Sequence, residues 1–171
     1  MIMKKILLLA VFALAAFVIY SYTNRQDDKA FKKEALENKM VALDGSSIAF
    51  KDILKKYKGK TIVIDVWASW CSDCIKGMPK VKALQTQFPD VTYLFVSMDK
   101  TPEAWKKGIE KYEVVGEHYM ATDGMKGVFG KSIDLNWIPR YMVIDKKGKI
   151  ALFRAIEADD TKLIETLKTL K

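Results

Sequence analysis

Residues 63–74 have the sequence VIDVWASWCSDC, in which an apolar run leads directly to two cysteines separated by two residues. The apolar run, residues 61–67, is nearly continuous and therefore predicts a strand buried on both faces. A helix is predicted to follow over residues 71–88. This spacing places both sulfurs on the first helical turn, with Cys71 at the exposed end and Cys74 one turn deeper.

Two cysteines in this position indicate thiol–disulfide exchange, in which the attacking group is a thiolate. At the start of a helix, Cys71 faces unpaired backbone N–H groups and the positive end of the helix dipole. We therefore expect the pKa of the Cys71 thiol to lie below that of a free cysteine. Cys74 is expected to be shielded and to act as the resolving thiol.

Other roles for the cysteine pair fit the sequence less well. A structural disulfide that closes two residues gains little loop entropy. A structural zinc site needs four ligands, whereas the chain has two cysteines and one histidine. A c-type haem needs a histidine directly after the second cysteine, where Ile75 stands. The sequence therefore implies no metal site and no organic cofactor.

The rest of the chain predicts an α/β domain. Asp44-Gly45 separates two short segments, which indicates an N-terminal β-hairpin. Further strands are predicted at 91–98, 141–144 and 150–155, further helices at 52–57, 101–112 and 160–170, and, from weaker signals, a strand near 118–121 and a helix near 125–132. Together these elements predict a mixed central sheet covered by helices on both faces.

The N-terminal segment 1–22 has the pattern of an export signal, because two lysines precede fifteen apolar residues. As a helix, fifteen residues span about 22 Å, which flanking lysines and tyrosines can extend toward the ~30 Å hydrocarbon layer. We predict an uncleaved membrane anchor with the remaining chain on the extracytoplasmic (periplasmic) side. The alternative is a cleaved signal peptide and a secreted protein. Residues 23–38 are predicted to be a charged tether and residues 39–171 the folded domain.

The formal net charge of +8 describes a basic protein. Acidic residues are interleaved with the lysines, which is typical of a solvated basic surface that favours an anionic membrane face. The pattern does not indicate a nucleic-acid patch, so nucleic acid is not an expected partner.

Several separated features resemble the thioredoxin-fold superfamily, and the chain from about Lys39 onward resembles the membrane-anchored thiol–disulfide reductases of the TlpA and ResA type. Asp65 matches the buried carboxylate beneath the cysteines of these proteins, and Pro79 matches the proline that kinks their active-site helix. The segment Trp137-Ile138-Pro139 matches the one that holds their cis-proline. Residues 113–136 match the insertion that distinguishes the TlpA type.

The resemblance implies a mechanism. The thiolate of Cys71 attacks the disulfide of a partner protein, Asp65 takes the proton of Cys74, and Cys74 then releases the reduced partner. Asp65 has an alternative role as the acceptor of a buried structural hydrogen bond. Trp70 directly precedes the nucleophile, so we expect it to form the apolar rim of the substrate-binding surface, with a place in the core as its alternative role. The resemblance implies that Pro139 is cis, and Ile138 beside it is expected to hydrogen-bond an extended substrate segment. Electrons are expected from a membrane-embedded thiol donor.

The sequence departs from the resemblance at three places. The spacer between the cysteines is Ser72-Asp73 instead of a Gly-Pro or Glu-Pro pair. The carboxylate of Asp73 opposes thiolate formation, whereas Lys76 and Lys80 nearby favour it, so the net effect on the thiolate stays open. Gly77 stands where many TlpA-type reductases carry a functional glutamate. Arg140 follows the proline where threonine is common, which biases the groove toward acidic partners.

Two other functions remain open at this point. An oxidase or isomerase would run the same exchange in another direction, since thioredoxin-fold proteins span about −120 to −270 mV. A copper metallochaperone would bind copper through Cys71, Cys74 and His118. An extracytoplasmic copper carrier of this fold would be expected to have three residues between its cysteines, whereas this chain has two. We also expect His118 to be a surface strand residue and not a ligand.

Overall fold

Strand β3 (Ile62–Trp67) is the apolar run that precedes the cysteines, and all six of its residues are buried. The structure is a computed structural model that describes residues 30–171. The predicted segment 1–22 and the first part of the predicted tether lie outside the described residues. Among the described residues, no helix is both long and apolar enough to cross a membrane.

The sheet has seven strands in the order β2-β1-β5-β4-β3-β6-β7. Strand β3 is parallel to β4 (Thr92–Ser97) and antiparallel to β6 (Arg140–Ile144). The remaining strands are β1 (Lys39–Ala42), β2 (Ser47–Ala49), β5 (Glu117–Ala121) and β7 (Ile150–Ala155). The predicted mixed sheet is thereby confirmed.

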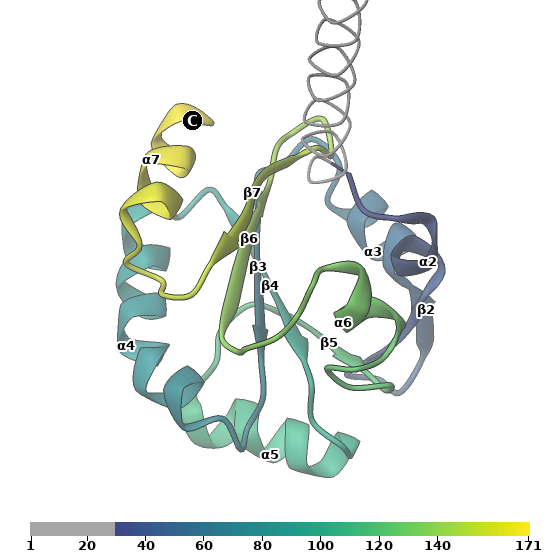
Figure 1. The fold of residues 1–171 in the computed structure, drawn as a ribbon. Helices are drawn as coiled ribbons and strands as arrows, with labels where there is room; N and C mark the ends of the chain where they lie inside the picture. The colour runs from purple at the N-terminus through teal and green to yellow at the C-terminus, as the bar shows by residue number, and fades with distance from the viewer. Residues whose placement is uncertain (1–29) are drawn as a thin grey trace, which may run out of the picture.

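Helices cover both faces of the sheet (Figure 1). One face carries α4 (Ser72–Gln87), α5 (Pro102–Tyr112) and α7 (Thr161–Thr169). The other face carries α2 (Lys33–Glu37), α3 (Phe50–Lys56) and α6 (Val128–Ser132). Aromatic side chains join this second layer, since Phe50 makes edge-on contacts with Phe31 and with Phe129.

Helix starts follow the capping residues of the sequence. At α5 the side chain of Thr101 accepts a hydrogen bond from the N–H of Ala104 at 3.3 Å, and Pro102 occupies the first helical turn. At α7 the carboxylate of Asp160 accepts from the N–H of Lys162 at 2.7 Å. These side chains satisfy N–H groups that the helix leaves unpaired, so both helices begin within a residue or two of the predicted position.

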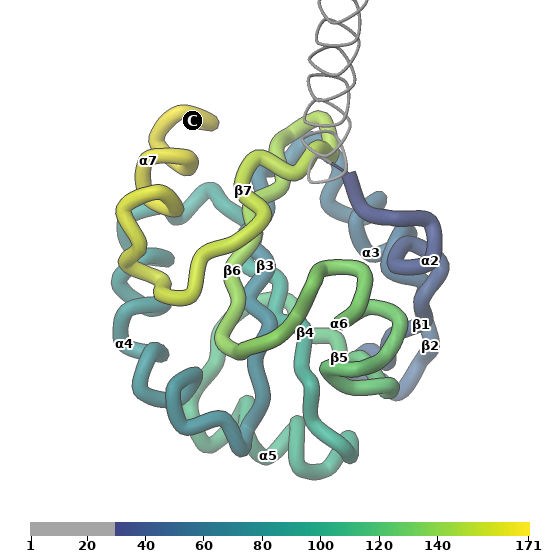
Figure 2. The backbone as a smooth tube through the Cα atoms, in the orientation of Figure 1, coloured from purple at the N-terminus to yellow at the C-terminus, as the bar shows by residue number. Residues whose placement is uncertain are grey.

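The folded domain begins earlier than predicted. Phe31 and Ala35 are buried, with exposed fractions of 9% and 0%, although both lie within the predicted tether. Ala35 lies in α2 and Phe31 lies two residues before this helix. Helix α2 contacts α3 and α6, and Phe31 packs against Phe50 of α3. The start of the packed region is therefore near Phe31 and not at Lys39. In Figure 2 this first stretch of the described chain runs alongside α3.

Candidate active site

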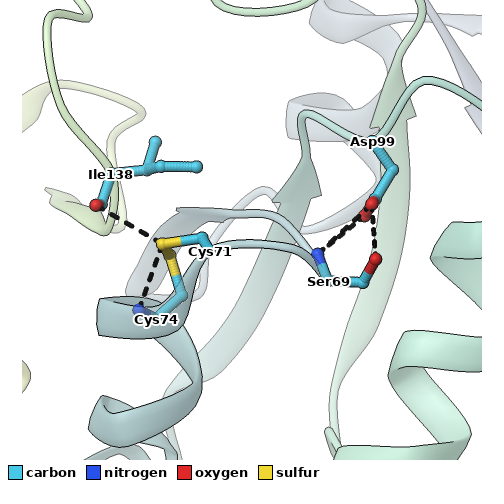
Figure 3. The surroundings of a disulfide bond; sticks show 5 residues. All are labelled: Ser69, Cys71, Cys74, Asp99 and Ile138. Atoms are coloured by element: carbon cyan, nitrogen blue, oxygen red, sulfur yellow. Dashed lines mark hydrogen bonds between the residues drawn. A yellow bond between two sulfur atoms is a disulfide. The ribbon is translucent and has the colours of Figure 1, made fainter.

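Cys71 and Cys74 are joined by a disulfide, with their Cα atoms 5.3 Å apart. Cys71 is the N-cap of α4, and its Sγ accepts a hydrogen bond from the N–H of Cys74 at 3.1 Å (Figure 3). The exposed fraction is 7% for Cys71 and 1% for Cys74. The difference is small, but it makes Cys71 the more exposed residue, and Cys71 is the cysteine expected to attack a partner.

The loop before β6 brings a proline segment against the disulfide. The peptide bond between Ile138 and Pro139 is cis, as the resemblance implied. The carbonyl oxygen of Ile138 lies 3.5 Å from Sγ of Cys71 (Figure 3). A disulfide sulfur carries no hydrogen, so this contact can become a hydrogen bond only after reduction. Two tryptophans beside this contact, Trp70 and Trp137, are more than half exposed.

A second carboxylate, which the sequence analysis did not identify, anchors the loop that precedes Cys71. Asp99 is buried and accepts hydrogen bonds from the N–H of Ser69 at 3.0 Å and from its hydroxyl at 2.6 Å (Figure 3). It also accepts from the hydroxyl of Ser97 at 2.7 Å. On the other side, a Cβ added to Gly108 of α5 would collide with the Cβ of Ser69. The loop is therefore held from two directions.

The signal for this anchor was present in the sequence. Ser97 and Asp99 come at the end of the apolar run at 91–98, which was already predicted to be a buried strand. The strand lies parallel to β3, so the carboxyl ends of both strands meet at one edge of the sheet. Polar residues at that edge are candidates for contact with the loop of Cys71.

Asp65 lies on β3 with an exposed fraction of 2%, and within residues 30–171 neither of its oxygens has a hydrogen bond of normal geometry. Its face of the sheet is the one under α4, because Tyr93, on the same face, donates a hydrogen bond to the carbonyl oxygen of Leu84. Burial raises the pKa of Asp65 to about 8, against a weaker opposing effect of the Tyr141 hydroxyl. The carboxyl can therefore gain or lose a proton near neutral pH.

A pocket of about 310 Å³ opens beside the cis-proline. Helix α4 supplies four of its lining residues, the proline segment and β6 supply three, and the segment after β7 supplies three: Asp73, Lys76, Gly77, Lys80, Trp137, Pro139, Tyr141, Ile156, Glu157 and Ala158. On its rim Lys80 forms ion pairs with Glu157 and, at 3.0 Å, with Asp159. The pocket therefore combines apolar walls with charged groups.

Arg140 does not contribute to this groove, so the expectation that it attracts acidic partners is wrong. Its exposed fraction is 1%, and its guanidinium donates hydrogen bonds to the carbonyl oxygen of Ile133 and to Oδ1 of Asn136, both at 3.0 Å. Alternation along β6 places Arg140 on the face opposite Tyr141. Burial lowers the pKa of Arg140 to about 10.

His118 is also buried, so the expectation of a surface strand residue is wrong. Its ring stacks on Phe95 with centroids 5.3 Å apart, and Nε2 lies 3.0 Å from the carbonyl oxygen of Val114. Burial lowers the pKa of His118. Among residues 30–171 no three histidine, cysteine or acidic side chains are grouped to hold a metal ion. The structure thus gives no support to a copper site that includes His118.

The fold and the site define a thioredoxin-fold thiol–disulfide oxidoreductase: a Cys-x-x-Cys disulfide caps a helix and faces a cis-proline at the edge of a mixed sheet. The chain belongs to the Redoxin family, whose model matches residues 27–166.

Known proteins agree with this assignment. The thiol-disulfide oxidoreductase ResA of Bacillus cereus is 27% identical over 175 residues, which cover 99% of this chain and 96% of that protein. The thioredoxin domain of a thiol-disulfide oxidoreductase from Bacteroides vulgatus superposes with a TM-score of 0.63 at 28% identity, covering 78% and 92% of the two chains. A thiol:disulfide interchange protein from Bacteroides sp. gives 0.62 at 28% identity, covering 77% and 83%.

Proposed function

We propose that this oxidoreductase reduces the disulfides of partner proteins on the extracytoplasmic side of a membrane. The observation that carries the reductive direction is the environment of the Cys71 sulfur. A thiol pair is a strong oxidant when its thiolate is strongly stabilised, because the reduced form is then favoured. A pair whose thiolate has little stabilisation keeps its disulfide and acts as a reductant.

The groups around Cys71 give a thiolate less stabilisation than the sequence predicts. Its sulfur accepts one hydrogen bond, from the N–H of Cys74, while the carbonyl oxygen of Ile138 lies on its other side. Asp73 adds a carboxylate in the first turn of α4. Lys80, a cation that the sequence analysis expected to favour the thiolate, is engaged by Glu157 and Asp159 instead. We therefore expect a low potential, nearer about −270 mV than about −120 mV.

The proposed reaction has two steps. In the first, the Cys71 thiolate attacks a sulfur of the partner's disulfide, and a mixed disulfide forms as the partner's second sulfur leaves. In the second, Asp65 accepts the proton of Cys74, whose thiolate attacks Cys71 and releases the reduced partner. In this proposal the disulfide between Cys71 and Cys74 forms in the second step.

We also propose how the partner binds. Trp70 and Trp137 provide exposed apolar surface on the two loops that meet at Cys71. The cis-proline leaves no N–H at position 139, so an extended segment could pair with the backbone of Ile138 as an added strand. The pocket beside Pro139 would then receive a side chain of this segment.

The location and the electron donor rest on the sequence. The apolar segment within residues 1–22 supports a membrane anchor, and the scattered basic surface supports contact with an anionic membrane face. A pair that reduces partners must itself be reduced again. We propose a membrane-embedded thiol protein for this role, because it would lie within reach of an anchored domain.

A redox titration tests the direction. The full chain, in a mild detergent, is equilibrated with mixtures of reduced and oxidised glutathione, and the fraction of disulfide is measured. A midpoint reduction potential of about −270 mV supports a reductase, whereas a midpoint of about −120 mV would make the protein an oxidase.

Two variants test the assignment of the cysteines. Cys71→Ser should abolish reduction of a disulfide substrate such as insulin, and Cys74→Ser should trap the mixed disulfide as a covalent complex. Full activity in Cys71→Ser would refute the proposed chemistry.

A further inference from the structure

A row of side chains crosses the sheet at the level of Asp65. Asp65 is paired with Phe95 on β4 and with Tyr141 on β6, and Phe95 is in turn paired with His118 on β5. Residues paired in this way lie on the same face of a sheet, with neighbouring strands about 4.8 Å apart. The row therefore places the buried carboxyl of Asp65 between one apolar ring and one phenol.

Tyr141 is the member of this row that reaches the pocket. Its side chain is almost fully buried yet forms part of the pocket lining. A Cβ placed on Gly77 of α4 would lie 3.8 Å from the Tyr141 hydroxyl, so this hydroxyl extends under the active-site helix. Because Gly77 has no side chain, nothing at that position separates the hydroxyl from the pocket.

We propose that Tyr141 is a positioning residue, whose hydroxyl holds the Asp65 carboxyl in place for proton transfer with Cys74 and connects it to the pocket. The inference rests on the proposed role of Asp65 in the resolving step, whichever direction the overall reaction takes. Within residues 30–171 Asp65 has no hydrogen bond of normal geometry, so Tyr141 is its one candidate donor on β6. Such contacts are often long in a resting site and shorten during reaction.

The proton can be followed through the step. Cys74 gives its proton to the Asp65 carboxylate and attacks Cys71; the bond from Cys71 to the partner breaks, and the partner's thiolate leaves with the electron pair. While Asp65 is ionised, the Tyr141 hydroxyl donates to it. Once Asp65 is protonated it donates to the Tyr141 oxygen instead, and the phenolic hydrogen turns toward the pocket.

Apart from Asp65, the charged groups near this path lie at the pocket. Toward β4 and β5, Asp65 meets Phe95 and then His118, a buried ring that burial keeps neutral by lowering its pKa. Helix α4 and its N-cap contribute the two cysteines and, at the pocket, Asp73, Lys76 and Lys80. The segment after β7 contributes Glu157 and Asp159. Burial, followed by the effect of Asp65, raises the pKa of Tyr141, so its hydroxyl keeps its proton as a donor.

Two-phase release of an aromatic thiol tests the proposal. Reduced full-length protein is mixed with the symmetric disulfide of thionitrobenzoate: attack by Cys71 releases the first thiol, and attack by Cys74 on the mixed disulfide releases the second. Tyr141→Phe should leave the first phase within twofold of wild type and slow the second about tenfold at pH 7. The pH at which the rate of the second phase is half-maximal should rise by about one unit, because the Asp65 carboxylate loses a hydrogen-bond donor.

Matched variants separate positioning from packing. Tyr93→Phe removes another buried hydroxyl from the same sheet face, one that donates to Leu84, and should leave both phases unchanged. Asp65→Asn should slow the second phase and remove its pH midpoint. The double variant Asp65→Asn with Tyr141→Phe should be no slower than Asp65→Asn alone, because Tyr141 acts through Asp65.

The outcomes distinguish the inference from the proposed function. Three outcomes would overturn the role of Tyr141. Tyr141→Phe could slow both phases equally, or it could slow the second phase by the same factor at every pH. In the double variant, the losses of the two single variants could multiply. A wild-type midpoint near −120 mV in glutathione would overturn only the reductive direction. Carboxyl NMR of oxidised protein gives a second measurement, in which Tyr141→Phe should raise the titration midpoint of Asp65.

Discussion

Asp65 and Asp99 have the same exposed fraction, 2%, but their carboxylates differ in the hydrogen bonds that they accept. Asp99, just after β4, accepts hydrogen bonds from Ser69 and Ser97 and thereby fixes a loop. Asp65, within β3, has no such bond from residues 30–171. Burial of a carboxylate is tolerated where hydrogen bonds replace water, and it is costly elsewhere. The first aspartate therefore stabilises the structure, while the second carries a free-energy cost that fits a role in proton transfer.

The largest effect should come from Asp65→Asn, which should stabilise the oxidised protein at high pH. Below pH 4, Asp65 is protonated in both the folded and the unfolded state. Between pH 4 and 8 the unfolded chain loses this proton while the folded chain keeps it, so stability falls as pH rises. The gap between 3.8, the ordinary value, and about 8 corresponds to roughly 6 kcal/mol above pH 8.

Urea unfolding of wild type and Asp65→Asn at pH 4 and pH 9 checks this value. The two proteins should differ little at pH 4 and widely at pH 9. Equal stabilities at both pH values would remove the distinction between the two aspartates.

The second effect has the opposite sign. Asp99→Ala leaves one N–H and two hydroxyls without their acceptor, so it should destabilise the fold by about 3 kcal/mol at pH 7. Urea unfolding measures the change, and Asp99→Asn, which retains one acceptor oxygen, should lose less. Stabilisation in either variant would show that Asp99, too, is held at a cost.

Gly108→Ala tests the same loop from the side of α5. The added methyl group would collide with the Cβ of Ser69, so either the helix or the loop must shift. Overpacking of this kind costs about 1–3 kcal/mol. Thermal unfolding gives the loss, and Gly45→Ala in the solvent-facing turn shows the cost of a positive φ without a collision. A loss no greater than that of the turn variant would argue against close packing at Ser69.

Ser69→Ala should have the smallest effect. It removes one hydroxyl bond to Asp99 and keeps the bond from the backbone N–H, so the expected loss is about 1 kcal/mol. The same unfolding assay applies. If Ser69→Ala destabilised the protein as much as Asp99→Ala, the hydroxyl and not the carboxylate network would be the anchor.

Local patterns were sufficient to predict the β3–α4 junction, because a buried strand and a helix start each leave a signal within a few residues. The assignments of Asp65, Cys71 and Cys74 as site residues came from the same stretch together with the resemblance. The roles of these residues, like those of Trp70, Ile138 and Pro139, stay predictions until the variants are measured.

The errors concern residues whose surroundings come from distant parts of the chain. Arg140 follows a proline and precedes an apolar run, and nothing nearby in sequence shows that carbonyl groups of residues 133–134 would bind it on the far face. His118 is buried because α5 returns the chain to a strand beside Phe95. Phe31 lies in a polar segment, and its burial depends on Phe50. Long-range packing decided each case.

The anchored loop has a consequence for how partners are chosen. With Ser69 fixed by Asp99 on one side and by α5 on the other, the disulfide is presented in one arrangement before any partner arrives. Because this loop is already ordered, we expect partner binding to cost little conformational entropy in the enzyme. We expect selectivity to depend on the exposed rim, so that a change at Trp70 or Trp137 should alter which partner proteins bind and leave the exchange chemistry itself intact.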